Sequence, residues 1–356
     1  MNKMKACIAK VMHLWDRAYP QNARMSARQA GQQLSEETKK LGQQLTEGTK
    51  KLEQQLSRME KELEQSRCRE NRLEAQLKSL QHQQTEQQNR FLRTTPQPRL
   101  EYFVLSILDH CNLRCKGCDH FAAIAEKRFI EPEVISRDLQ RMSELTHGHV
   151  TRIGVMGGEP LLHPRLLEIV VETRKWFPET RVQIVSNGLL LNQQNEEFWA
   201  VCRENRIEIV VTKYPLQLDF DRMTETAKAQ GVAFQFYDKT GEVLKTSTKM
   251  TMDPEGMQNP IDSFVHCYHA NRLPLLMEGR FYGCPIAANV RHFNKKFGTN
   301  MQPEEGDWLD IYSLTDVNEL THFICSPRPF CRYCNTRGRI FGMPWSRSEQ
   351  KMDEWV

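Results

Sequence analysis

The stretch Asp109-His-Cys-Asn-Leu-Arg-Cys-Lys-Gly-Cys-Asp-His-Phe121 is the most informative part of the sequence, because it holds three cysteines in a CxxxCxxC spacing: Cys111, Cys115 and Cys118. It follows the apolar run from Tyr102 to Leu108, which predicts a buried strand that delivers the cysteines to a loop at its carboxyl end. Three close thiolates suit zinc or an iron–sulfur cluster, whereas a closed structural site takes four ligands. The loop therefore predicts an open metal position.

The overall composition excludes some classes of function. The chain has 356 residues, 39% of them hydrophobic, and its 49 basic residues nearly balance 45 acidic ones. A net charge of +4 gives no polyanion-binding signal, so we expect no nucleic-acid partner. Because the sequence lacks an apolar run of about 18 residues and a signal-peptide pattern, we expect no transmembrane segment and a cytoplasmic location. There, eleven cysteines indicate metal or redox chemistry rather than disulfides.

Strand and helix patterns alternate through the middle of the chain. The periodicity predicts strands over 102–108, 151–156, 181–185, 207–212 and 232–237. It predicts helices over 132–146, 164–177, 192–205 and 219–230. Repeated strand–helix units indicate an α/β fold with a parallel sheet, whose functional residues lie on loops at the carboxyl ends of the strands.

A CxxxCxxC loop after the first strand resembles the signature of the radical S-adenosylmethionine (radical SAM) superfamily. In that family the three cysteines hold a 4Fe-4S cluster, and SAM chelates the fourth iron. An electron from the cluster cleaves SAM to methionine and a 5'-deoxyadenosyl radical, which abstracts a substrate hydrogen. The resemblance implies a partial (βα)6 TIM barrel, with one strand still to be placed. On spacing alone, a zinc knuckle is the alternative.

Two further segments resemble SAM-binding elements of the same family. Gly157-Gly158-Glu159-Pro160 follows the second predicted strand and matches the GGEP element. Ser186 and Asn187 follow the third strand, in a Ser-Asn-Gly sequence that also suits an ordinary turn. The resemblance implies that Gly157, Gly158, Glu159, Pro160, Ser186 and Asn187 contact SAM. The sequence departs from the family at Gly117, where many members carry an aromatic residue that packs on adenine.

A second cysteine group lies nearer the carboxyl end, at Cys267, Cys284, Cys331 and Cys334. Between the first two, residues 275–282 predict a hairpin that turns at Glu-Gly. This arrangement resembles the Twitch domain, a shortened SPASM domain, and implies one auxiliary 4Fe-4S cluster. A structural zinc ribbon is the alternative. Cys325 is the odd cysteine: an exchangeable ligand, an inert thiol or a hydrogen donor.

Some residues have weaker signals. We interpret the isolated histidines His163, His269 and His292 as packing or surface residues, and the segment Met343 to Val356 as a cap over the barrel mouth or simple packing.

The residues before the barrel have a different composition. Residues 1–25 predict a short amphipathic helix, and residues 26–93 predict a coiled coil in which several leucines recur every eleven residues. A lone helix cannot bury that stripe, so we expect a homo-oligomer, with a solvated helix as the alternative. We further expect a linker over 94–99, a radical SAM core over 100–260, a Twitch-like domain over 261–340 and a tail over 341–356.

The resemblance implies an oxidoreductase that needs an electron donor such as flavodoxin or ferredoxin. We expect a radical SAM enzyme that oxidises or epimerises a small hydroxylated, sugar-like substrate. Modification of a peptide is the second hypothesis. A coiled-coil scaffold whose cysteines only hold structural metal is the third.

Overall fold

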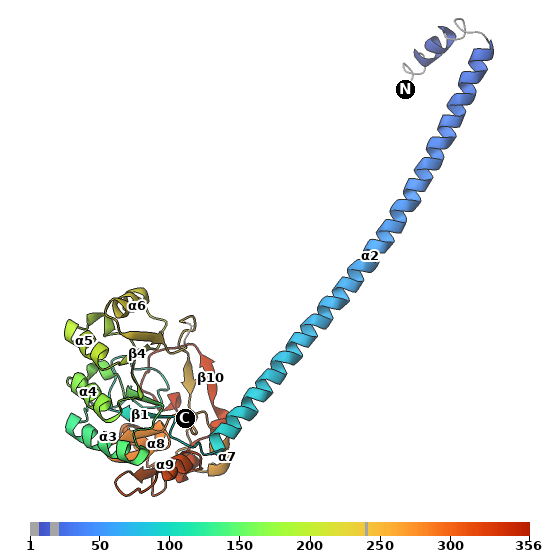
Figure 1. Cartoon of the computed structure of the whole chain (residues 1–356). Coiled ribbons are helices and arrows are strands. Elements are labelled where there is room, and N and C mark those ends of the chain that lie inside the picture. Colours follow the sequence, from blue (N-terminus) through green and yellow to red (C-terminus); the bar gives the residue numbers. More distant parts are fainter. Residues whose placement is uncertain (1–6, 15–20, 239–240) are drawn as a thin grey trace. The chain divides into compact units, whose positions relative to one another are not determined.

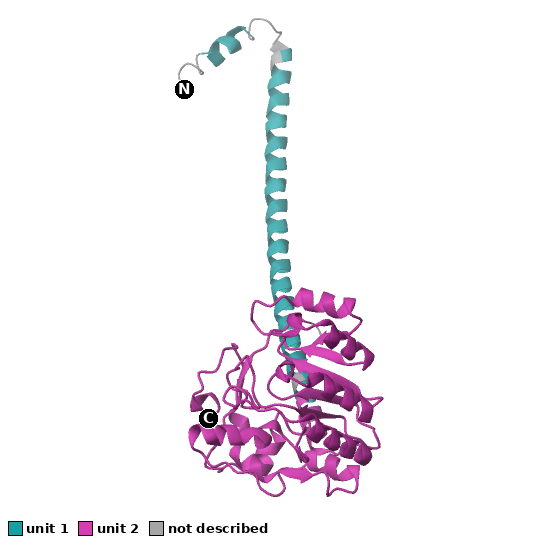
Figure 2. Ribbon diagram, turned by 90° about the vertical axis from the view of Figure 1, so that its left-hand side faces the viewer, with its two compact units in different colours: residues 1–84 teal, residues 85–356 magenta. Residues whose placement is uncertain are grey.

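The computed structural model describes residues 7–14, 21–238 and 241–356, and the chain forms two compact units, Met1–Gln84 and Thr85–Val356 (Figure 2). Residues 7–14 are helical, and the rest of the short helix predicted over 1–25 lies partly outside the described residues. Among the described helices, none combines the length and apolar character needed to cross a bilayer.

One long helix dominates the first unit and ends at the predicted linker. Helix α2 runs without interruption from Gln21–Thr94, so it begins before the coiled-coil start predicted at residue 26. It ends two residues before Pro96, whose ring cannot continue a helix. Its leucine side chains lie in solvent; Leu52 and Leu56 are 67% and 60% exposed. The stripe is therefore unburied within a single chain.

The second unit is built on an eight-stranded sheet in the order β5-β4-β3-β2-β1-β7-β8-β9 (Figure 1). Strands β1 to β5 and β7 are parallel, whereas β8 and β9 are antiparallel. The strands are β1 (Tyr102–Ser106), β2 (Arg152–Met156), β3 (Arg181–Ser186), β4 (Glu208–Val211), β5 (Ala233–Phe236), β7 (Leu275–Met277), β8 (Arg280–Tyr282) and β9 (Trp308–Asp310). The predicted α/β fold with a parallel sheet is confirmed.

Helices alternate with the parallel strands, and Figure 1 shows α3 to α6 in a row along one side of the unit. The helices are α3 (Pro132–Thr146), α4 (Leu166–Trp176), α5 (Glu196–Glu204), α6 (Phe220–Ala229), α7 (Pro260–Val265), α8 (Pro285–Phe297) and α9 (Val317–Ile324). A small second sheet pairs β6 (Ser247–Lys249) with β10 (Ile340–Met343). Each predicted strand and helix of the barrel is present, with ends that differ by no more than a few residues.

The sixth parallel strand is the first arm of the predicted hairpin. β7 and β8 pair antiparallel, and the two turn residues, Glu278 and Gly279, both have positive φ, of 51° and 75°. Such a turn matches the twist of a tight hairpin. β7 also pairs parallel with β1, with Val104 opposite Leu275. Because one sheet crosses the division expected at 260/261, the core and the C-terminal segment pack as parts of one unit.

The two faces of the parallel sheet differ in polarity. On one face, Phe103 and Leu105 of β1 are at most 1% exposed, and the ring of Phe103 packs edge-on against Phe177 after α4. Alternate residues carry polar groups on the other face: the Arg152 guanidinium lies 4.2 Å from the centre of the Tyr102 ring, and the Gln183 side chain donates to Glu208. The core therefore lies between the sheet and its helices, and the inner face is polar.

Candidate metal centre

The cysteine loop after β1 is held by the backbone of the Gly-Gly-Glu-Pro turn after β2. Gly158 N donates to Leu108 O at 3.1 Å, and Glu159 N donates to His110 O at 3.1 Å. A Cβ on Gly158 would lie 1.8 Å from His110 O, and one on Gly157 would lie 2.2 Å from Leu108 O. The two glycines therefore allow close approach of the cysteine loop.

Glu159 joins the ends of β2 and β3. Its buried carboxylate accepts hydrogen bonds from Leu161 N (3.1 Å), Ser186 Oγ (2.7 Å) and Asn187 N (2.8 Å). Burial raises the pKa of this carboxyl to about 7, although these hydrogen bonds oppose the rise. The carboxylate thus faces the Ser-Asn-Gly turn and fixes its position.

Asn187 connects that turn to the cysteines. Its Nδ2 donates to Asn112 Oδ1 at 2.8 Å and lies 3.6 Å from Cys111 Sγ. Its Oδ1 accepts from Leu189 N at 2.9 Å, which orients the amide. The elements predicted from three separate strands therefore meet at one place, at the carboxyl ends of β1, β2 and β3.

The three thiols of the first site are free and partly buried. Burial raises the pKa of Cys111 to about 11 and raises the pKa of Cys115. The side chains of Trp345 and Tyr214 approach the Cys115 sulfur and oppose that rise. The Trp345 indole nitrogen is otherwise buried without a hydrogen-bond partner. Because a metal or cluster ligates the thiolate, an unused donor beside a buried thiol fits a site built for such a group.

Gly117, the departure from the family pattern, has a local cause. Its φ is +67°, and a Cβ there would lie 2.2 Å from Thr248 O. An aromatic side chain at this position is therefore excluded by the neighbouring backbone. Tyr214 and Trp345, whose rings pack edge-on at 5.5 Å, provide aromatic surface beside Cys115 instead.

The C-terminal tail packs along the cysteine loop. Lys116 N donates to Ser346 O at 3.0 Å, and Ser348 N donates to Arg114 O at 2.8 Å. The Trp355 indole donates to Cys118 O at 2.9 Å, and this side chain is fully buried. Of the two roles expected for the tail, packing is thus supported, and it fixes the backbone that carries the cysteines.

The second cysteine group lines one small cavity. Cys267, Cys284, Cys331 and Cys334 all face it, together with His269, Arg328 and Arg339. Cys284 caps the start of α8, where its sulfur accepts from Ala287 N at 3.5 Å. Cys331 and Cys334 lie in and just after a 3-10 turn, Pro329–Tyr333. Cys325 is buried at the end of α9 and is not among the residues that line the cavity.

Positive charge surrounds these four thiols. Arg339 is buried, its Nη1 lies 3.7 Å from Cys267 Sγ, and its Nε and Nη2 have no hydrogen-bond partner. Burial would raise the pKa of Cys267, but the charge of Arg339 and the nearby His269 outweigh it and lower the pKa to about 5. A guanidinium with unused donors fits a cavity that holds an anionic, thiolate-ligated group.

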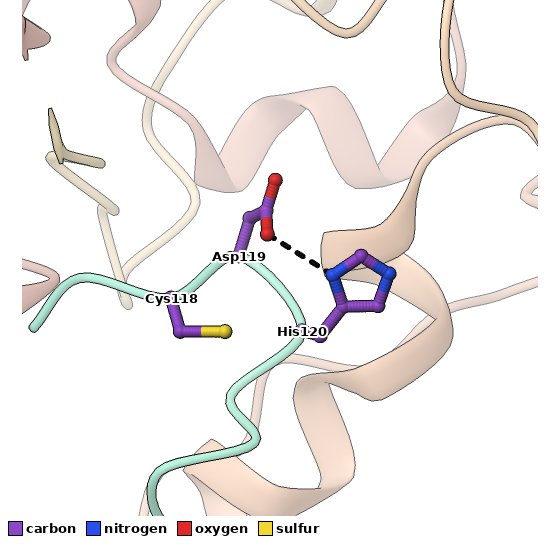
Figure 3. Close-up of side chains that lie close together, drawn as sticks. All are labelled: Cys118, Asp119 and His120. Atoms are coloured by element: carbon purple, nitrogen blue, oxygen red, sulfur yellow. Dashed lines mark hydrogen bonds and ion pairs between the residues drawn. The ribbon is translucent and has the colours of Figure 1, made fainter. Parts of the chain in front are cut away.

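The spacing of possible ligand atoms differs between the two cysteine sites. Among the described residues, three such atoms come within 4.8 Å of one another at Cys118, Asp119 and His120 (Figure 3). No three of the four cavity thiols lie that close together.

One residue of the second site was not predicted from the sequence. His269, which we expected to be a packing or surface residue, has its Nε2 3.0 Å from Asp119 Oδ2, and its side chain approaches the Cys267 sulfur. Its only local signal is a position two residues after a cysteine. His163 and His292 are buried as packing residues; the former bonds to Ile130 O, and the latter lies beside Asp109.

Comparisons with known proteins find similarity over the part of the chain that contains the first site. Residues 105–218 match the Radical SAM superfamily. The GTP 3',8-cyclase of Trichodesmium erythraeum (strain IMS101) is 30% identical over 105 residues, which are 28% of this chain and 31% of that protein. GTP 3',8-cyclase 2 of Mycobacterium bovis (strain ATCC BAA-935 / AF2122/97) is 34% identical over 90 residues, 24% of each protein. The matches thus span less than a third of these relatives' length.

Solved structures show more distant likenesses. BtrN, in complex with AdoMet and 2-DOIA, is 17% identical, with a TM-score of 0.39 over 66% of this chain and 93% of that one. Streptococcus suis SuiB, bound to the precursor peptide SuiA, is 15% identical, with a TM-score of 0.33 over 45% of this chain and 37% of that one. Neither likeness is close enough to carry an argument about substrate.

Proposed function

Because residues 105–218 match the Radical SAM superfamily, we propose that this chain reductively cleaves SAM at Cys111, Cys115 and Cys118. We further propose that it holds an auxiliary 4Fe-4S cluster at Cys267, Cys284, Cys331 and Cys334. It would use the two centres to oxidise or epimerise a small hydroxylated, sugar-like substrate. When bound, the first cluster and SAM together supply a 5'-deoxyadenosyl radical.

The observation that carries the first part is the contact of Asn187 with the cysteine loop. The Asn187 amide lies 3.6 Å from Cys111 Sγ, and the turn that carries it is fixed by Glu159. This supports a binding segment made of Gly157, Gly158, Glu159, Pro160, Ser186 and Asn187. Within it, Glu159 acts as the internal support, and Asn187 presents its amide beside the cluster ligands.

The auxiliary cluster is supported by the chemistry of its cavity. Four thiols face one space, and two nitrogens of the Arg339 guanidinium have no hydrogen-bond partner there. A cluster ligated by four cysteine thiolates is anionic, so a buried cation lowers the cost of enclosing it. A second redox centre suits a two-electron oxidation, because the substrate radical left after hydrogen abstraction must lose a further electron.

The polar inner face of the barrel supports a polar substrate. Tyr102, Arg152, Gln183 and Glu208 all lie on this face, and side chains capable of hydrogen bonding recognise hydroxyl groups. Modification of a peptide remains the second candidate reaction. The position of Cys325 away from the cavity lining makes it the weakest of the proposed functional thiols.

We also propose the partners of this enzyme. The exposed leucines of α2 support a homo-oligomer formed through the coiled coil. The cleavage of SAM requires an electron donor such as flavodoxin or ferredoxin. Two thiol-ligated clusters suit the reducing cytoplasm.

Metal analysis after anaerobic reconstitution tests this proposal. We expect roughly eight irons and eight sulfides per chain, and about four of each when Cys111, Cys115 and Cys118 are all replaced by Ala. The variant with Ala at Cys267, Cys284, Cys331 and Cys334 should also retain about four. Zinc in place of iron at the second site would overturn the auxiliary cluster. An absence of iron from both sites would instead support a scaffold.

A further inference from the structure

A contact between Asp119 and the buried His269 joins the two cysteine sites. His269 Nε2 lies 3.0 Å from Asp119 Oδ2, and His120 Nδ1 lies 3.0 Å from the other carboxylate oxygen. Asp119 directly follows Cys118 of the first site, and His269 follows Cys267 of the second site by two residues. One carboxylate therefore connects loops that are 150 residues apart in sequence.

The connection continues from the ring of His269 to the second site. The side chain of His269 is 5% exposed, and its Nδ1 is buried without a hydrogen-bond partner. The sulfur that the side chain approaches is that of Cys267, which the backbone N–H of His269 also approaches. An imidazolium donates from both ring nitrogens, whereas neutral imidazole donates from one. Between a carboxylate and a metal-bound thiolate, both donors have an anionic acceptor.

We infer that Asp119 holds His269 so that Nδ1 donates a hydrogen bond to the Cys267 thiolate, and that this bond raises the reduction potential of the auxiliary centre. The inference rests on the auxiliary cluster proposed above. Hydrogen bonds to ligating sulfurs tune cluster potentials, because they stabilise the more negative, reduced state. A carboxylate that orients a histidine beside a metal ligand is a common outer-shell arrangement. His269 and Asp119 are thus positioning residues.

The charged surroundings of the bridge agree with this arrangement. Besides Asp119, the groups that act on His269 are the Cys267 thiol and the Arg339 guanidinium. Arg339 Nη1 lies 3.7 Å from the same sulfur, so the side chains of Arg339 and His269 both lie beside Cys267. A hydrogen bond at this ligand is therefore placed where it affects the charge on the cluster.

The test uses the full chain with Cys111, Cys115 and Cys118 replaced by Ala, so that only the auxiliary centre is loaded. The potential of that centre is measured by an EPR-monitored redox titration, with and without His269→Gln. The matched control is His266→Gln, because His266 lies on the same turn and bonds to Asp262 O at 2.9 Å instead. We expect a more negative potential for His269→Gln, an unchanged one for His266→Gln, and equal iron content in both.

A double-mutant cycle with Asp119→Asn then tests whether His269 acts through Asp119. We expect His269→Gln to shift the potential by less than half as much in the Asp119→Asn protein. Circular dichroism checks that each variant folds. If His269→Gln does not fold, His269→Asn is used in its place. An unchanged potential, or the same shift in both backgrounds, overturns this inference alone. Failure of the parent to load a cluster overturns both this inference and the proposed auxiliary cluster.

Discussion

Gly158 and His110 approach so closely that a Cβ on the glycine would lie 1.8 Å from the carbonyl oxygen of His110. This contact seats the cysteine loop against the turn after β2. We therefore expect Gly158→Ala to lower the free energy of unfolding by more than about 2 kcal/mol, because backbone cannot yield as a flexible side chain can. We also expect less iron to be bound at the first site in this variant.

Gly42→Ala is the control for that change, since nothing lies within 4 Å of a Cβ added at Gly42 in α2. Thermal unfolding and iron content measure both effects. Equal loading of the two variants would show that the Gly158 contact does not hold the cysteine loop.

Replacement of Asn187 separates SAM binding from cluster loading. Asn187→Ala removes the amide that lies between Asn112 and Cys111 but leaves the cysteines and Glu159 in place. We expect near-native iron content and an affinity for SAM that is lower by about tenfold, the effect of losing one or two hydrogen bonds. Asn192→Ala, on the same connection but bonded to Asp219 O, is the control. Equilibrium dialysis measures the affinity for SAM. If Asn187→Ala binds SAM as tightly as the native chain, Asn187 is not part of the SAM-binding segment.

The buried Asp109 should make stability depend on pH in acid. Burial would raise its pKa, but a hydrogen bond from His292 and the charge of Arg291 outweigh burial and lower the pKa from 3.8 to about 2. A carboxyl with a lowered pKa stabilises the fold above its unfolded pKa and loses that contribution as the pH falls through the folded value. The shift corresponds to about 2 kcal/mol at neutral pH.

We therefore expect Asp109→Asn to destabilise the protein at pH 7 and to flatten the loss of stability between about pH 4 and pH 2. Urea unfolding across this range measures both quantities. Asp221→Asn, at an exposed position on α6, should change stability by less than about 1 kcal/mol. If Asp109→Asn is as stable as the native chain at pH 7, the ion pair with Arg291 does not support the start of the cysteine loop.

The exposed leucine stripe of α2 predicts that the protein forms an oligomer, whose mass falls when the stripe is disrupted. Leu52 and Leu56 are 67% and 60% exposed in the single chain, and their burial against a second copy would stabilise an oligomer. We expect sedimentation to give a dimer or trimer for the native protein and a monomer for the double change Leu52→Glu and Leu56→Glu. Gln54→Glu, off the stripe, should leave the mass unchanged. A native protein that is monomeric at micromolar concentration would refute the coiled-coil proposal.

The sequence predicted the parallel sheet well, because each strand of the barrel is a short apolar run between helical patterns. It left the sixth strand unplaced, because β7 is only three residues long and reads as one arm of a hairpin. Its pairing with β1, across about 170 residues between Val104 and Leu275, has no local signature. Long-range pairing was thus the missing part of the fold.

The same limit applies to the site. The cysteine spacings and the GGEP and Ser-Asn-Gly elements are local, so they could be read directly. The contact of Asp119 with His269 joins distant loops, and a histidine near a cysteine is too common a pattern to single out. In the sequence, Gly117 stands where the family pattern has an aromatic residue. The reason lies in the fold, because the neighbouring Thr248 carbonyl leaves no room for a side chain there.

The most direct test of the central claim is the formation of 5'-deoxyadenosine from SAM by the anaerobically reconstituted protein with a strong reductant. Chromatography should detect the product with the native chain and with Cys331→Ala, which alters only the second site. Cys115→Ala should abolish it, because it removes a ligand of the first cluster. No product from the iron-loaded native protein, or product with Cys115→Ala but none with Cys331→Ala, would contradict the account.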